Sequence, residues 1–165
     1  MQDYLMTLLG GLAITLQLTA FSLLLGVLMA AGMTWVLERR IPVVTQLVQL
    51  WVLVFTGTPL LIQIFLIYYG PGQFEWLKAG PLWPLLKQPW FCAVLALGFN
   101  TAAYSTRLFK GALDAIPAGE VEACRALGFS AGQTLWMKAR HAARRLVPAY
   151  SNEVILVLKG SSLAS

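Results

Sequence analysis

Residues 8–37 read LLGGLAITLQLTAFSLLLGVLMAAGMTWVL and contain no Asp, Glu, Lys, Arg or His. A helix needs about 20 mainly apolar residues to cross a bilayer, so this stretch is long enough to form a membrane span. The charges Glu38, Arg39 and Arg40 follow at once, and Pro42 breaks the helix there. No basic segment precedes the apolar stretch, which is also too long for a cleavable signal peptide, so we expect it to remain as a helix.

The rest of the chain repeats this pattern. No Asp, Glu, Lys or Arg occurs in the 34 residues 41–74 or in the 19 residues 88–106. Overall, 58% of the residues are hydrophobic and 12% are charged, whereas a soluble domain has about a quarter charged. The composition therefore predicts one all-α integral membrane domain, residues 8–165. Its expected spans are 8–37, 46–69, 90–108 and 147–165, and its main loop is 109–146.

Basic residues are distributed unevenly. Seven of the twelve lie in segment 107–145 and two in the turn at 38–46, whereas the loop at 70–90 has two. Cytoplasmic loops carry the excess of Lys and Arg, so both basic segments are predicted to be cytoplasmic and the N-terminus periplasmic. The same rule accounts for the pI near 9.5 without nucleic-acid binding. The cysteines, Cys92 and Cys124, are expected to lie too far apart for a disulfide.

The first span carries four glycines: Gly10, Gly11, Gly26 and Gly32. Small residues allow another helix to approach closely in lipid, although glycine is common in membrane helices in general. The second span is interrupted by Thr56-Gly57-Thr58-Pro59. A broken helix at membrane depth must be buried in protein or line a cavity, so this break is either part of a translocation path or a simple proline kink.

Three polar side chains in the apolar segments are candidates for such a path. Gln63 follows the break by one turn, and Asn100 lies within span 90–108. Asn100 is equally suited to hold two helices together. Glu153 lies within span 147–165, where a carboxylate is costly unless it is paired, hydrated or close to the membrane surface. This last span ends abruptly, so we expect the sequence to be a fragment of a longer chain.

The loop contains the run E-V-E-A-C-R-A-L-G-F-S, residues 120–130. We predict a short helix over 120–127 that Gly128 ends in the left-handed conformation. Ser130 and Gln133 have the spacing of a capping box and should begin the next helix. This helix–turn–helix either presents a rigid surface to a soluble partner or lies on anionic lipid through its arginines.

The loop also carries a resemblance. Glu122-Ala123-Cys124 followed by Gly128 resembles the E-A-A-x-x-x-G loop of the membrane subunits of bacterial ABC importers. The surrounding sequence resembles polar amino-acid permeases, and arginine permeases in particular. The matching segments are T-G-T-P-L-L-I-Q at 56–63, Y-Y-G-P-G-Q at 68–73, N-T-A-A-Y-S-T at 100–106 and Y-S-N-E-V at 150–154.

The resemblance implies the transmembrane domain of a type I ABC importer, with about four of five transmembrane helices present. It implies three kinds of partner in the bilayer and beside it: a second permease subunit of the same or another kind, a cytosolic pair of ABC ATPases, and a periplasmic amino-acid-binding protein. The residues expected to couple to the ATPase are Glu120, Glu122, Ala123, Ala126 and Gly128. Gln63, Asn100 and Glu153 would lie along the substrate path, where Glu153 suits an α-amino or guanidinium group.

Two features depart from the family pattern. Cys124 replaces the usual second alanine, which exchanges one small residue for another. The family usually continues with I-x-L-P about ten residues after the glycine, where this chain has Lys138-Ala139-Arg140-His141. The second half of the loop is therefore expected either to dock differently or to be impaired. His141 is the only histidine, and we interpret it as a surface residue rather than a ligand or an acid–base group.

The sequence contains no G-x-x-x-x-G-K-S/T motif, so ATP is expected to bind to the partner and no cofactor or metal to this chain. We expect no catalytic residues and hence no enzyme. Three alternatives stay open: a permease for histidine, glutamine or another polar amino acid, a non-transporting scaffold subunit whose basic loop binds lipid, and an intramembrane enzyme, for which no suitable group of side chains is evident.

Overall fold

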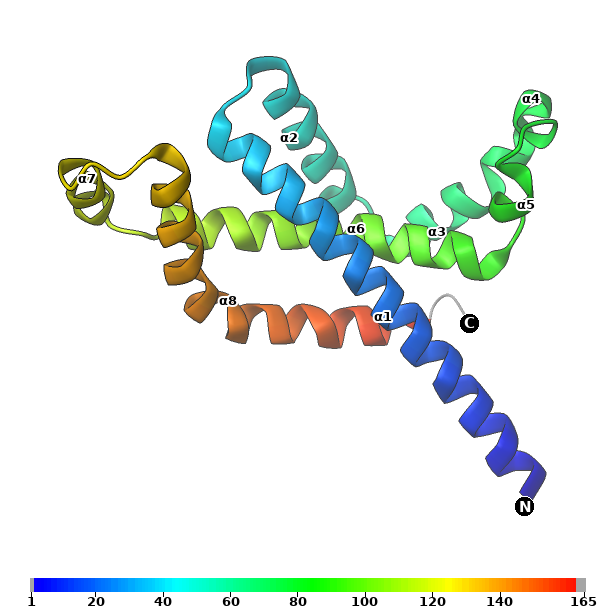
Figure 1. Ribbon diagram of the computed structural model, residues 1–165. Coiled ribbons are helices and arrows are strands. Elements are labelled where there is room, and N and C mark those ends of the chain that lie inside the picture. The colour runs from blue at the N-terminus through cyan, green and yellow to red at the C-terminus, as the bar shows by residue number, and fades with distance from the viewer. Residues whose placement is uncertain (1, 163–165) are drawn as a thin grey trace.

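The computed structural model describes residues 2–162, and all regular secondary structure in that range is helical (Figure 1). The long helices are α1 (Gln2–Arg39), α2 (Pro42–Gly57), α6 (Pro89–Asp114) and α8 (Ala131–Ser161). The shorter ones are α3 (Leu60–Tyr69), η1 (Pro71–Gln73), α4 (Glu75–Lys78), α5 (Trp83–Leu86) and α7 (Ala118–Ala126). The predicted all-α class is confirmed.

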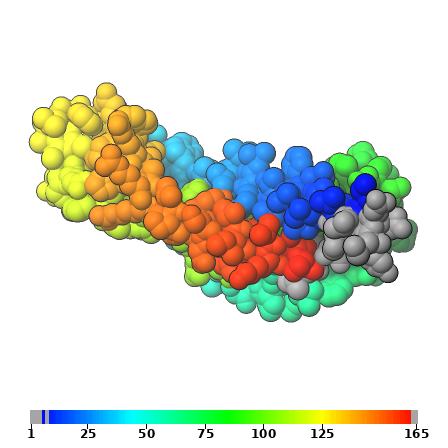
Figure 2. All heavy atoms as spheres, turned by 90° about the horizontal axis from the view of Figure 1, so that it is seen from below, coloured from blue at the N-terminus to red at the C-terminus, as the bar shows by residue number. Residues whose placement is uncertain are grey.

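Helix α6 forms the centre of the fold. It packs against α1, α8, α3 and α2, and α1 also contacts α8. Seen from below, α8 and α1 lie along the same face, and α7 projects beyond them at one end (Figure 2). Most of the residues that α6 buries are small: Cys92, Ala93, Ala96, Gly98, Ala102, Ala103 and Ser105. Small side chains let neighbouring helices approach the α6 backbone from several sides.

The crossing of α1 and α6 depends on two glycines. A Cβ atom added to Gly26 would lie 2.6 Å from Cγ2 of Thr101, and one added to Gly98 would lie 2.6 Å from Cδ2 of Leu25. The predicted close approach is therefore found at Gly26. Gly10, Gly11 and Gly32 have no such neighbour within 4 Å.

The first helix turns sharply into the second. Helix α1 ends at Arg39, and Arg40 has a φ of 52°, a left-handed conformation that a side chain other than glycine rarely adopts. Pro42 then begins α2, where its missing N–H leaves no hydrogen bond unmade. The helix end predicted from Glu38–Pro42 is thus confirmed.

The second apolar stretch is two helices rather than one rod. By length and composition, residues Leu9–Arg39 of α1 can cross a membrane alone, whereas Pro42–Gly57 and Leu60–Gln73 qualify only together, with a bend of 109° between them. The break predicted at Thr58 and Pro59 is therefore present, and it is much sharper than an ordinary proline kink.

The predicted span 90–108 lies within α6, and residues 147–161 of the predicted span 147–165 belong to α8. Neither helix is among those of the described chain that qualify by apolarity. Helix α6 does not qualify because polar residues lower its apolarity. Three of these residues, Thr101, Ser105 and Thr106, are buried and face other helices rather than lipid. The last three residues of the span 147–165 lie outside the described residues.

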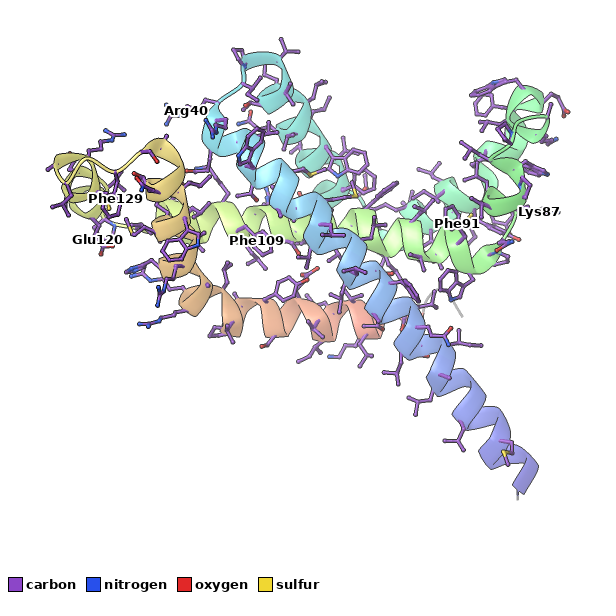
Figure 3. All side chains as sticks on the ribbon, viewed as in Figure 1. Arg40, Lys87, Phe91, Phe109, Glu120 and Phe129 are labelled. Carbon is purple, nitrogen blue, oxygen red and sulfur yellow. The ribbon has the colours of Figure 1, made fainter. Side chains whose placement is uncertain are left out.

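The two ends of the molecule differ in what they display. The α1–α2 turn with Arg40 and the α7 segment with Glu120 and Phe129 lie toward one end (Figure 3). Lys87 and the short helices α4 and α5 lie toward the other (Figures 1 and 3). The two segments predicted to share the cytoplasmic side therefore lie at the same end.

Candidate functional site

The α7 segment is a rigid projection built from local sequence signals. Helix α7 begins at Ala118, two residues earlier than predicted, with Pro117 as its N-cap residue. At its end, Phe129 N donates to Cys124 O at 3.0 Å, and Gly128 N donates to Arg125 O at 3.0 Å. This is the Schellman arrangement, which needs a left-handed residue, and Gly128 has a φ of 78°.

Helix α8 begins with the predicted capping box. The Ser130 Oγ atom accepts from Gln133 N at 3.3 Å, and Ser130 N donates to Gln133 Oε1 at 2.8 Å. Helix α7 thus ends with a Schellman pair of hydrogen bonds, and α8 begins with a reciprocal capping box. The turn holds the two helices at a fixed angle, because neither end can unwind without losing these hydrogen bonds.

Four of the five predicted coupling residues lie on the outer side of α7 and of the turn after it, and Glu120 lies beside His141 of α8. Glu122, Ala123, Ala126 and Gly128 are exposed, and Glu120 is half-exposed. The inner side consists of Cys124, which is 8% exposed, and Val121. Val121 packs against an apolar cluster of Leu113, Ile116 and Ala142 at the adjoining ends of α6 and α8. The sulfur that replaces alanine at position 124 therefore faces the protein and leaves the outer surface unchanged.

Two exposed apolar side chains extend this surface. Leu127 is 75% exposed and Phe129 is 41% exposed, both in the turn beside the outer side of α7. Sequence reasoning did not select them, although their place in a polar loop was a signal. Together with the small alanines, they give α7 a surface that a partner could cover closely.

The segment that departs from the family pattern is held by charged neighbours. Lys138 Nζ lies 2.5 Å from Glu38 Oε2. Glu38 lies at the end of α1, and sequence reasoning did not select it as a site residue. His141 Nδ1 lies 3.4 Å from Glu120 Oε2 on α7. Lys138 and His141 thus attach α8 to α1 and α7.

Gln63 and Asn100 meet at the break between α2 and α3. Gln63 is 5% exposed. Its Nε2 donates to Phe55 O at 2.9 Å and to Thr58 O at 3.0 Å. Asn100 Nδ2 donates to Gln63 Oε1 at 3.0 Å and to Phe55 O at 3.3 Å.

These bonds replace what proline removes. In an unbroken helix, Phe55 O would accept from the N–H of residue 59, but Pro59 has none. Of the carbonyls beside it, Val54 O accepts from Thr58 Oγ1 at 2.8 Å. The break is therefore a stabilised structure, and Asn100 holds two helices together in it.

Glu153 occupies the buried side of α8. It is 6% exposed and shares that side with Val157 and Gly160, one and two turns further along. Gly160 marks close contact with α6, because a Cβ atom there would lie 3.3 Å from Leu97 Cδ2. Within residues 2–162, no cation or hydrogen-bond donor reaches the Glu153 carboxylate.

Two other polar atoms near this level of the fold are also buried. The hydroxyl oxygens of Ser105 on α6 and Tyr150 on α8 face each other across the two helices. Tyr150 precedes Glu153 by one turn, and its ring lies 6.1 Å from that of Phe109, which faces α8 from α6 (Figure 3). Buried polar groups normally have partners, so these atoms suit a polar guest or water.

The other chemical possibilities are limited. Cys92 and Cys124 are both free and buried, as expected. No group of three or more His, Cys, Asp or Glu side chains in the described part of the chain could hold a metal ion. The site is thus a set of buried polar groups around α6 together with a rigid exposed surface on α7.

Comparisons with known proteins agree with this arrangement. Residues 22–165 match the family profile of the "Binding-protein-dependent transport system inner membrane component". The chain is 49% identical to the arginine ABC transporter permease protein ArtM of Haemophilus influenzae, over 99% of this chain and 72% of that protein. It is 50% identical to ArtM of Escherichia coli K12, over 99% of this chain and 74% of that protein.

The chain also matches a more distant relative and a solved structure. The octopine transport system permease protein OccM of Rhizobium radiobacter is 40% identical, over 96% of this chain and 65% of that protein. A solved structure described as an amino acid ABC transporter with histidines superposes with a TM-score of 0.86 and 29% identity. The superposition covers 99% of this chain and 73% of that chain.

Proposed function

We infer that arginine is the substrate of this chain, which belongs to the binding-protein-dependent transport system inner membrane component family and is a permease subunit of an ABC importer. The observation that carries the choice of substrate is the identity of 49–50% to arginine permeases along 99% of the chain. The octopine permease points to the same chemistry, since octopine, like arginine, contains a guanidinium group.

We place the substrate contact at Glu153. A carboxylate that is 6% exposed is unfavourable unless something balances it, and a guanidinium group would supply both charge and hydrogen bonds. The buried hydroxyls of Ser105 and Tyr150 would add neutral contacts. Gln63 and Asn100 have a structural role instead, because their hydrogen bonds shape the broken α2–α3 segment beside the path.

We further propose that α7 docks on a cytosolic pair of ATPases. Its outer side is exposed, its inner side is anchored, and its two ends are fixed by the Schellman turn and the contacts to α8. This chain then performs no covalent chemistry, and ATP binds to the partner. The remaining partners are a second permease subunit and a periplasmic binding protein. The chain lies in the inner membrane with its N-terminus on the periplasmic side.

Uptake measurements test the substrate. Vesicles containing the assembled importer should accumulate labelled arginine, and an excess of unlabelled histidine or glutamine should compete poorly. Glu153→Gln keeps the size of the side chain and removes its charge, so arginine uptake should fall by about tenfold or more. Glu75→Gln is the matched control, because it removes the charge of an exposed carboxylate outside the apolar segments and should leave uptake unchanged. Normal arginine uptake by the Glu153 variant would contradict the assignment.

A charge reversal tests the docking of α7. Glu122→Lys should leave the permease folded, since the side chain is exposed. However, ATP hydrolysis should no longer drive uptake in this variant. Co-purification of the ATPase with the permease after detergent extraction provides the binding measurement. Unchanged uptake and co-purification by the Glu122→Lys variant would refute the docking role.

A further inference from the structure

One carboxylate joins three helices that are distant in the sequence. Glu38 at the end of α1 lies 2.5 Å from Lys138 Nζ on α8 and 3.1 Å from Lys110 Nζ on α6, through its two different oxygens. Lys110 also pairs with Asp114, one turn later on α6. We call Glu38, Lys110 and Lys138 the Glu38 cluster.

Two side chains of the Glu38 cluster are largely sheltered from water, and the third, Lys110, is 31% exposed. The side chains of Glu38 and Lys138 are 14% and 17% exposed. Burial alone would lower the pKa of Lys110, but hydrogen bonds to Asp114 and Glu38 raise that pKa above its usual value, so the ammonium stays charged. An ion pair of this kind is screened little by salt, and removal of one partner leaves an uncompensated charge.

Two members of the Glu38 cluster, Glu38 and Lys138, line the same cleft as the α7 projection. The cleft, of about 310 Å³, has Arg125 and Phe129 on the α7 side and Glu38 and Lys138 on the other. Around the cleft, α7 is attached to α6 and α8: Val121 packs on their apolar cluster, and Arg145 Nη1 of α8 donates to Ala115 O at 3.0 Å in the α6–α7 connection. A displacement of α7 therefore moves the adjoining ends of α6 and α8 together.

We propose that Glu38 is the positioning residue through which movement of α7 reaches α1. A docked ATPase pair would shift α7. Helices α6 and α8 would follow α7 and carry Lys110 and Lys138 with them. The ion pairs of these lysines with Glu38 would then move the end of α1. This inference rests on the proposed function, because only a motor docked at α7 would supply the movement. Glu38 contacts neither substrate nor nucleotide in this account.

The test uses the assembled importer in vesicles, with its ATPase and binding protein. Arginine uptake and ATP hydrolysis stimulated by the binding protein are measured in the same preparation. Glu38→Gln keeps the shape of the side chain and removes the charge that holds both lysines. Uptake should fall about tenfold while ATP hydrolysis changes by less than about twofold, so more ATP is hydrolysed per arginine imported.

Two further variants complete the test. Lys138→Glu should resemble Glu38→Gln. The double variant Glu38→Lys/Lys138→Glu restores an ion pair of reversed sign, and Asp114 together with the carboxylate at position 138 balances the ammonium groups at positions 38 and 110. Uptake by the double variant should recover to within about threefold of the original chain. The matched control is Glu75→Gln, which removes an exposed ion pair with Lys78, 2.8 Å long, at the other end of the molecule, and it should change neither measurement.

Three outcomes would overturn the inference: uptake by Glu38→Gln within about twofold of normal, an equal loss of uptake and ATP hydrolysis, or an assembled double variant that does not recover. If Glu38→Gln fails to assemble, the double variant decides. Glu122→Lys separates this inference from the proposed function. Should Glu122→Lys uncouple the importer while Glu38→Gln leaves it normal, the docking of α7 stands and the role of Glu38 fails. Should neither uncouple it, docking itself is refuted.

Discussion

The Asn100 side chain of α6 donates a hydrogen bond of 3.0 Å to the Gln63 side chain of α3, and both amides donate to the same carbonyl, Phe55 O. Pro59 has removed the backbone donor that this carbonyl would have in a continuous helix. The two amides thus form a bridge between helices and a cap for the end of α2. A helix broken in this way, at 109°, holds its shape without water.

We expect Gln63→Leu to destabilise the protein. The leucine fits a site of similar size but leaves Phe55 O and Thr58 O with fewer donors, which costs about 1–3 kcal/mol for a buried polar group. The thermal unfolding midpoint of the detergent-extracted protein measures the loss. Adding Pro59→Ala should reduce the effect, because residue 59 regains an N–H. A full loss in the double variant would show that the amide does not replace the proline's missing donor.

The crossing of α1 and α6 leads to a second prediction. The Cβ atom that Gly26→Val adds would lie 2.6 Å from Thr101 Cγ2 and 3.3 Å from Ala102 N, so α1 and α6 must separate. Overpacking of this kind costs about 1–3 kcal/mol, seen as a lower melting temperature. Gly32→Val on the same helix is the control, because nothing lies within 4 Å of its added Cβ. Equal destabilisation by both variants would contradict this account of the crossing.

The turn after α7 depends on a left-handed residue. Gly128 has a φ of 78°, a conformation that costs a residue with a side chain roughly 1–2 kcal/mol. Gly128→Ala should therefore lower ATPase co-purification and uptake together, by about fivefold to tenfold. Gly128→Asn should be milder, since Asn tolerates this region. Gly119→Ala, at a helical position with open space, is the control that should retain both activities. Normal uptake by Gly128→Ala would show that the turn need not be rigid.

Cysteine labelling tests the orientation in the membrane. The native Cys92 and Cys124 are 1% and 8% exposed, so they should react slowly with a membrane-impermeant maleimide. Leu127→Cys, at a position 75% exposed, should react only from the cytoplasmic side, and Trp76→Cys, at a position 72% exposed, only from the periplasmic side. Bound ATPase should protect the cysteine at position 127. Reaction of that residue from the periplasmic side would refute both the topology and the docking of α7.

The sequence was sufficient for features that depend on near neighbours in the chain. It predicted the helix end at Glu38–Pro42, the break at Pro59, the left-handed Gly128 and the capping box of Ser130 and Gln133, and each is confirmed. Backbone conformation and hydrogen bonds three or four residues apart decide these features, so residue type and spacing are enough. The motifs likewise identified the family, because their order along the chain reflects a shared fold.

Only the tertiary structure decided which residues meet across helices. The sequence proposed close approach for four glycines of α1, and the structure places one of them, Gly26, against α6. Glu38 and Lys138 pair although 100 residues separate them, and Gln63 meets Asn100 across 37. Such pairs depend on how each helix is rotated and tilted against α6. Side-chain packing around the whole bundle sets those angles, so no local pattern in the sequence could give them.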